Sequence, residues 1–250
     1  MSGLTAKQIM IGTSGWMYKH WKGKFYPEDI AFSKFLDFYA QQFNTVEVNG
    51  TFYKLPETKT FQKWYEETPD NFLFSIKANR YLTHMKKLKN AEDSLKLFLE
   101  RVAALKSKLG PILFQLPPSW NCNYDRLHKF VNLLPEKLKY CFEFRNPTWI
   151  NNDVIELLKQ FNIAFCIYDL AGYSTEKIVT ADFIYIRLHG AGEEAYIGNY
   201  DTKALTNWSS FIVDQAKKGK EIYCYFDNDL NAYAPQNAMA LRQIIESKIK

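Results

Sequence analysis

The sequence predicts a (β/α)8 barrel, the TIM-barrel fold, because short apolar runs alternate with amphipathic segments along all 250 residues. Eight such runs occur, which is the number of strands in this barrel. Polar side chains gather where the runs end, as they do at the active-site face of a barrel. The length suits one large α/β domain, and we expect a single domain over residues 1–250.

The predicted strands are short and rich in Val, Ile, Phe and Tyr, as expected for buried parallel strands. The eight runs are Ile9–Thr13, Thr45–Asn49, Phe72–Lys77, Ile112–Gln115, Tyr140–Arg145, Ile163–Asp169, Phe183–His189 and Glu221–Asp227. A doubly wound open sheet is the alternative arrangement of such elements. It is less favoured, because no GxGxxG turn follows the first run.

Between the runs, apolar residues recur with the spacing of one helix face. The segments with this spacing are 32–43, 95–105, 127–134, 154–161 and 238–245. Asn90 is the expected N-cap of the second segment. Pro235 suits the first turn of the last one. The sixth β-α unit is predicted to be irregular, because residues 170–181 show no helical spacing.

Composition narrows the function only slightly. The formal net charge of +5 is a mild basic excess, which lacks the dense basic stripe of a dedicated nucleic-acid binder. It is compatible with a pocket for a small anionic ligand. Aromatic residues make up 16% of the chain, enough for a large core or for stacking on bases or sugars.

The four cysteines give no sign of a metal site or a disulfide framework. None belongs to a CxxC motif, and three of them lie inside apolar runs, where Cys acts as a small hydrophobic residue. We therefore expect no metal and no cofactor. No apolar stretch has the length of a signal peptide or a membrane span, so we expect a cytoplasmic protein with no membrane partner.

Polar or aromatic side chains lie at or just after the end of every predicted strand, where a barrel places its active site. The catalytic candidates are Glu47, Lys77, Glu143 and His189. The ligand-binding candidates are Trp16, Asn49, Tyr53, Asn79, His84, Gln115, Arg145, Tyr168, Asp169, Arg187, Asn228 and Asp229.

Strand parity supports this grouping, because successive side chains point to opposite faces. Glu143 shares a face with Arg145, and Arg187 shares one with His189, whereas the residues between them are apolar. The apolar face is expected to pack on helices, and the polar face to point inward. Buried charges need partners, and both signs are present here. A structural ion network is the plain alternative to a ligand site.

Seven stretches carry a family resemblance: GTSGWMYKHWKGKFYP (12–27), FNTVEVNGTFY (43–53), FSIKANRYLTH (74–84), GPILFQLPP (110–118), FEFRNPTW (142–149), IRLHG (186–190) and YFDNDLNAYAPQNA (225–238). Together they resemble the DUF72 family, the YecE-like proteins, in order along nearly the whole chain. The resemblance implies a TIM barrel and names no reaction. Asp227 departs from the family, which more often has Asn before Asn228 and Asp229.

The first functional hypothesis is a protein that binds or transforms a small anionic metabolite, such as a phosphorylated sugar or a nucleotide. Cationic Lys77, Arg145 and Arg187 would hold the anion. Amide side chains would contact hydroxyl groups: Asn49, Gln115 and Asn228. Carboxylate and imidazole groups would move protons: Glu47, Glu143, His84 and His189. Aromatic rings would wall the pocket: Trp16, Tyr53 and Tyr168.

Three alternatives stay open. A metal-dependent endonuclease, suggested by the remote likeness of the family's barrel to the endonuclease IV group, needs more His ligands than the four present, so nucleic acid is not favoured as a partner. Lys77 is a second possibility, as a Schiff-base nucleophile. A non-catalytic binding protein is the third. The aromatic loop Trp16–Tyr26 fits a lid over the site or a packed cap equally well.

Overall fold

The strand order of the structure is that of a (β/α)8 barrel. This computed structural model describes residues 8–249. Its strands follow the order β1, β9, β8, β6, β5, β4, β3, β2, and a parallel bridge joins Ser14 to Glu47, beyond the end of β1 and inside β2. The amide of Gly15 donates to the Glu47 carbonyl at 2.7 Å, which closes the order into a ring. The predicted fold class is therefore confirmed.

All eight predicted strands are present, with boundaries that mostly shift by one residue. They are β1 (Ile9–Thr13), β2 (Thr45–Val48), β3 (Leu73–Lys77), β4 (Leu109–Leu116), β5 (Tyr140–Phe144), β6 (Ala164–Leu170), β8 (Phe183–Leu188) and β9 (Glu221–Phe226). The largest difference is at β4, which begins at Leu109 although Pro111 resembles a break in the sequence.

The five predicted helices correspond to α1 (Phe35–Gln42), α4 (Glu92–Val102), α5 (Tyr124–Val131), α6 (Asn152–Gln160) and α8 (Tyr233–Ile249). Three further helices were not predicted: α2 (Gly50–Tyr53), α3 (Thr58–Glu66) and α7 (Thr202–Lys217). The expected cap at Asn90 is wrong, because Ala91 occupies the N-cap of α4 and Asn90 has a left-handed φ of 45°. Pro235 lies in the first turn of α8, as predicted.

Short helices complete the chain: η2 (Lys19–Trp21), η3 (Phe32–Lys34), η4 (Tyr81–Met85, a π-helix), η5 (Ala103–Lys108), η6 (Pro147–Trp149) and η7 (Leu230–Ala232). The irregular sixth unit is also confirmed. There a two-residue strand, β7 (Tyr173–Ser174), pairs antiparallel with β6, and residues 171–182 contain no helix. Among residues 8–249, no helix combines the length and apolar character needed to cross a membrane.

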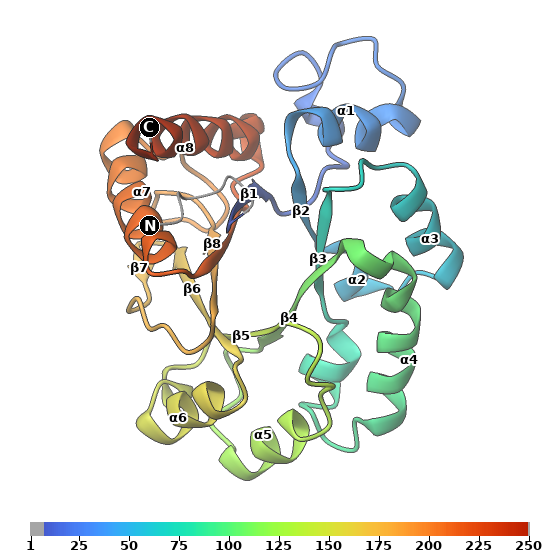
Figure 1. Cartoon of the computed structure of the whole chain (residues 1–250), viewed down its shortest axis with the longest axis vertical. Coiled ribbons are helices and arrows are strands. Elements are labelled where there is room, and N and C mark those ends of the chain that lie inside the picture. Colours follow the sequence, from blue (N-terminus) through green and yellow to red (C-terminus); the bar gives the residue numbers. More distant parts are fainter. Residues whose placement is uncertain (1–7, 250) are drawn as a thin grey trace. The chain divides into compact units, whose positions relative to one another are not determined.

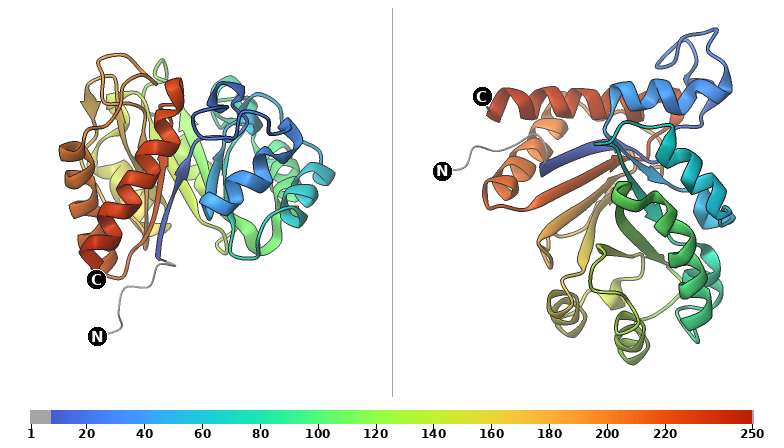
Figure 2. Two further views of the ribbon diagram at one scale, coloured as in Figure 1. Left: turned by 90° about the horizontal axis from the view of Figure 1, so that it is seen from above. Right: turned by 45° about the vertical axis from the view of Figure 1, so that its right-hand side comes forward.

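Residue contacts divide the chain into two compact units. Unit 1 contains the described residues up to Glu47, then Ile167–Lys177 and Asp182 onward. Unit 2 contains Val48–Cys166 and Ile178–Ala181. In unit 1, α7 and α8 lie side by side, and α8 also packs on β1 (Figures 1 and 2).

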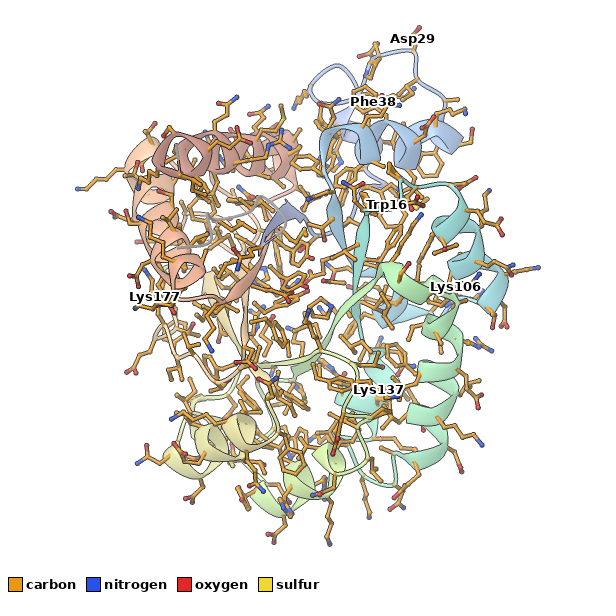
Figure 3. The ribbon with its side chains drawn as sticks, in the orientation of Figure 1. Trp16, Asp29, Phe38, Lys106, Lys137 and Lys177 are labelled. Carbon is orange, nitrogen blue, oxygen red and sulfur yellow. The ribbon has the colours of Figure 1, made fainter. Side chains whose placement is uncertain are left out.

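Aromatic packing fixes the first loop of unit 1, which joins β1 to α1. Trp21, Tyr26 and Phe35 are fully buried, and the Tyr26 ring stacks on Phe35 with centroids 4.1 Å apart. Phe38 on α1 adds an edge contact with Tyr26 at 5.5 Å. Asp29 occupies the outer end of this loop (Figure 3). The loop is therefore a packed structure of its own, which can position the side chains that precede it.

In unit 2, α3 and α4 lie side by side beside β3 and β4 (Figure 1). A buried lysine, Lys108, caps the C-terminal end of α3. Its Nζ donates to the carbonyls of Tyr65 and Thr68 at 2.5 and 2.6 Å. Burial lowers the pKa of this ammonium group, and the carbonyl oxygens stabilise its charge at the helix C-terminus.

Candidate functional site

Unit 1 holds a buried ion network centred on Arg187. Arg187 Nε and Nη2 donate to both carboxylate oxygens of Glu47, at distances from 2.8 to 3.1 Å. Glu47 also accepts from Ser14 Oγ at 2.6 Å and from the Tyr185 hydroxyl at 2.7 Å. All of these side chains are buried. Both oxygens of Glu47 are therefore engaged, and its geometry suits holding Arg187 in place.

Asp227 and His189 extend this network. Arg187 Nη2 donates to Asp227 Oδ2 at 2.9 Å, and His189 Nδ1 lies 3.0 Å from the same oxygen. On the other side of the ring, His189 Nε2 lies 3.3 Å from Arg187 Nη1. His189 is fully buried, whereas 11% of the Asp227 side chain is exposed. Asp227 is thus the member of the network with the most solvent access.

The aromatic loop docks onto the segment after β9. Trp21 Nε1 donates to the Asp229 carbonyl at 3.0 Å, and His20 Nε2 lies 2.9 Å from the same oxygen. Burial raises the pKa of the Asp229 carboxyl group, and the neighbouring charge of Asp227 raises it further. Burial also raises the pKa of the Tyr18 hydroxyl, with the same two carboxylates adding to the effect. Acidic charge therefore gathers at this end of β9.

Two further candidates of unit 1, Asn228 and Asp169, form hydrogen bonds with loop residues. Asn228 donates to the Gly198 carbonyl at 2.8 Å and to Asn237 Oδ1 at 2.9 Å, which anchors the loop after β8. Asp169 accepts from the Tyr200 hydroxyl at 3.2 Å, and burial raises the pKa of its carboxyl group.

Two aromatic candidates of unit 1 are buried. The Trp16 side chain lies beneath the protein surface, and its carbonyl accepts from the Tyr26 hydroxyl at 2.6 Å. The Tyr168 ring packs edge-on to His189, with centroids 6.3 Å apart. The Tyr168 ring therefore contributes packing beside the polar network, and Trp16 is part of the core of unit 1.

In unit 2, Arg145 pairs with Glu143. The Arg145 guanidinium donates to a carboxylate oxygen of Glu143, which is fully buried, and the Cys166 thiol lies 3.8 Å from the other oxygen. Gln115 is the partner of Glu143 in the β4–β5 register, so both side chains leave the sheet at the same level. As with Arg187, a carboxylate already engages this arginine.

Lys77 lies at the end of β3 against α2. Its Nζ sits over the Phe52 ring, 4.6 Å from the centroid. Thr51 Oγ1 donates to the Lys77 carbonyl at 2.7 Å, which ties α2 to β3. Asn49 precedes α2, and its Oδ1 is buried without a hydrogen-bond partner among residues 8–249. A buried amide oxygen of this kind can accept a hydrogen bond from a ligand hydroxyl.

His84 lies on the π-helical turn η4 beside these residues. Its ring packs edge-on against the same Phe52 ring, with centroids 4.9 Å apart. The pKa of His84 is lowered to about 4, first by burial and then by the positive charges of Lys77 and Arg80, although Glu143 acts in the opposite direction. His84 is therefore neutral at pH 7, in a locally positive environment.

Two other candidates of unit 2, Asn79 and Tyr53, lie in a backbone turn and on the exposed surface. Asn79 Oδ1 accepts from the Leu82 amide at 3.0 Å, so this side chain supports the turn that carries His84. Tyr53 is 75% exposed. Phe52 and Thr83 were not among the predicted site residues, although both lie next to residues that were, within the stretches 43–53 and 74–84.

The two units differ in charge. Unit 2 contains 18 Lys and Arg against 12 Asp and Glu, whereas unit 1 contains 14 against 15. The segment 71–91 holds five cationic residues and no acidic one. The basic excess of the chain thus belongs to unit 2, and the end of β3 lies within it. Within the described part of the chain, His, Cys, Asp and Glu side chains form no group of three or more suited to a metal ion.

Comparison with known proteins places the chain in a family. A sequence model described as "Protein of unknown function DUF72" matches residues 10–250. The chain belongs to the DUF72 family. A DUF72 family protein from Thermotoga maritima MSB8, known from a crystal structure, has a TM-score of 0.86 and 29% identity, covering 96% of this chain and 99% of that one.

Curated relatives agree with this assignment to DUF72. The UPF0759 protein YunF of Bacillus subtilis (strain 168) is 22% identical over 270 residues, which cover 95% of each chain. The UPF0759 protein YecE of Escherichia coli (strain K12) is 34% identical over 113 residues, which cover 45% of this chain and 42% of that one. These similarities establish the family and the fold, and they leave the ligand to be argued from the site.

Proposed function

We propose that this DUF72 protein binds a small anionic metabolite, such as a phosphorylated sugar or a nucleotide, at the end of β3 in unit 2. The observation that carries the proposal is that Lys77 and His84 pack on the same Phe52 ring, with Arg80 nearby. Burial lowers the pKa of His84 most, and Lys77 and Arg80 lower it further, which indicates a positive potential at the ring. An anion placed there offsets that potential, so its binding is favoured.

The surroundings of Lys77 support this assignment. The Phe52 ring presents an apolar surface next to Lys77, and the buried Asn49 Oδ1 can accept a hydrogen bond from a ligand hydroxyl group. Such a combination of apolar wall and few polar groups is typical of metabolite pockets. Arg145 and Arg187 were the other expected anion contacts. Carboxylates engage both of these guanidinium groups. The anion is placed at the end of β3 because Lys77 and His84 pack on the same Phe52 ring there, with Arg80 nearby.

Thermal unfolding tests the proposal. Inorganic phosphate, phosphorylated sugars and nucleotides are each compared with KCl of equal ionic strength. A ligand at ten times its Kd stabilises the protein by about 1.4 kcal/mol. For a chain of this size, that raises Tm by about 3–6 °C. We expect Lys77→Met to abolish the shift.

Lys106→Met is the matched control. Lys106 is an exposed lysine of unit 2 (Figure 3), and its Nζ lies over the Tyr65 ring at 4.8 Å, much as Lys77 lies over Phe52. This variant should keep the full ligand shift. If no anion raises Tm, or if Lys77→Met responds like Lys106→Met, the anion site at β3 is wrong.

A second candidate ligand is single-stranded nucleic acid. Tyr53 and Tyr81 are 75% and 44% exposed, and Lys86 Nζ lies 5.3 Å from the centre of the Tyr81 ring. Exposed rings beside cations are the usual platform for stacked bases. Fluorescence anisotropy with a short labelled RNA, measured across a salt series, tests this candidate, and Tyr81→Ala should weaken binding. Binding of phosphate but not RNA favours the small metabolite.

A further inference from the structure

The Thr83 hydroxyl engages His84 Nδ1. Thr83 Oγ1 lies 2.9 Å from His84 Nδ1 and 3.2 Å from the Asn79 carbonyl, to which it can donate its proton. In that arrangement Oγ1 accepts the Nδ1 proton, and because a neutral imidazole carries one proton only, a lone pair is left on Nε2. Among residues 8–249, no side chain or backbone group hydrogen-bonds to Nε2.

His84 and Lys77 are held on one scaffold. Both pack against Phe52: the ammonium group lies over the ring face and the imidazole meets it edge-on. Thr51 binds α2 to the Lys77 carbonyl, and the Asn79 side chain supports the turn of His84. A proton acceptor and a cation are therefore positioned beside each other by separate supports, the buried Thr51 and the half-buried Asn79. This is the arrangement that proton abstraction next to a carbonyl requires.

We infer that His84, protonated at Nδ1, and Lys77 form a proton-transfer pair that acts on a small anionic metabolite with a hydroxyl group next to a carbonyl. This inference rests on the proposed function, because the anion brings the substrate to β3. It adds the substrate class and a reaction. Aldose and ketose phosphates are compounds that combine all three groups.

The step proceeds as follows for a ketose phosphate. The C–H bond next to the carbonyl breaks, and its proton passes to His84 Nε2. The electron pair moves toward the carbonyl oxygen, which becomes an enolate oxygen stabilised by the Lys77 ammonium group. Return of the proton to the same carbon restores or inverts that centre. Return to the neighbouring carbon, with transfer of the hydroxyl proton between the two oxygens, interconverts ketose and aldose.

Substrate binding itself should strengthen the base. The low pKa of free His84 arises first from burial and then from Lys77 and Arg80. An anion bound to these cations offsets their part of the effect, which raises the pKa of His84 in the complex. The imidazole is then a better proton acceptor when substrate is present than when the site is empty.

Exchange of the substrate's carbon-bound hydrogen for deuterium tests the inference. The full chain is incubated in D2O with dihydroxyacetone phosphate, ribulose 5-phosphate or fructose 6-phosphate, and loss of the C–H signal is followed by NMR. We expect exchange above the uncatalysed rate with at least one of them. His84→Asn should reduce the exchange rate by about 100-fold or more, the usual contribution of a general base. His128→Asn, which alters an exposed histidine of α5, should exchange like wild type.

The thermal shift with the same phosphates separates the possible failures. His84→Asn should still bind them, which also shows that the variant is folded. Binding without exchange for all three compounds overturns the proton-transfer pair and leaves the anion site standing. Equal exchange rates in wild type and His84→Asn overturn it as well. Absence of both binding and exchange overturns the proposed function together with this inference.

Discussion

Arg187 and Glu47 form a bidentate ion pair inside unit 1, although 140 residues separate them in the sequence. The arginine is 1% exposed and the glutamate is fully buried. Removing one charge of such a pair leaves the other buried without compensation, which is far more costly than losing an ion pair at the surface. Substitution of one member of the pair therefore tests how much the network contributes to the free energy of unfolding.

Glu47→Gln should lower the free energy of unfolding by about 3–5 kcal/mol at pH 7, measured by denaturation in urea. The substitution keeps the shape of the side chain but places a neutral amide against Arg187. Asp214→Asn is the control, since Asp214 pairs with Lys218 at 2.7 Å on the exposed surface of α7 and should change stability by less than about 0.5 kcal/mol. Similar costs for the two variants would contradict a buried, structurally essential pair.

Lys108→Met should destabilise the protein by about 1.5–3 kcal/mol, because the carbonyls of Tyr65 and Thr68 lose a charged donor. The measurement is again urea denaturation. Lys106→Met, two residues away on the exposed side of η5, should stay within about 0.5 kcal/mol of wild type. If Lys108→Met is equally mild, water replaces the ammonium group at the end of α3.

Strand prediction succeeded because buried parallel strands are continuous apolar runs, which are visible in the sequence without tertiary information. The missed helices have different causes. In α7, Leu205, Trp208 and Ile212 do carry helical spacing, so this helix was predictable. In α3, Phe61 is the one buried residue, which is too little to mark an apolar face.

The site was predictable only in part. Strand parity correctly placed Glu47, Glu143 and Arg187 among buried side chains. It could not say which charges meet, because that depends on the register and order of distant strands. The tautomer of His84 depends on where the Thr83 hydroxyl sends its own proton, which no sequence pattern reports.

Acid should destabilise the wild-type protein partly through His84. In the unfolded chain this residue has a pKa of about 6.5, whereas in the folded protein its pKa is about 4. Between these values the unfolded state binds the extra proton, so stability falls as the pH drops from about 6.5 to 4. His84→Asn removes this contribution, which we expect to be on the order of 1 kcal/mol because water screens a half-exposed ring.

The measurement is the free energy of unfolding of wild type, His84→Asn and His128→Asn at pH 7 and pH 4.5. The loss between the two pH values should be smaller in His84→Asn than in the other two proteins. A loss of equal size in all three would mean that His84 titrates normally, and the positive potential at the end of β3 would lose its main support.

Thr83→Val should change the tautomer of His84. In the wild type, ¹⁵N NMR of the imidazole at pH 7 should show a protonated Nδ1 and an unprotonated Nε2, because in the inferred tautomer the Thr83 hydroxyl, 2.9 Å away, accepts the Nδ1 proton. Valine has nearly the same shape but no acceptor, so the preference for Nδ1–H should be lost. Thr206→Val, which removes an exposed hydroxyl of α7 that donates to the Thr202 carbonyl, should leave the His84 signals unchanged. A protonated Nε2 in the wild type would remove the proton acceptor on which the exchange reaction depends.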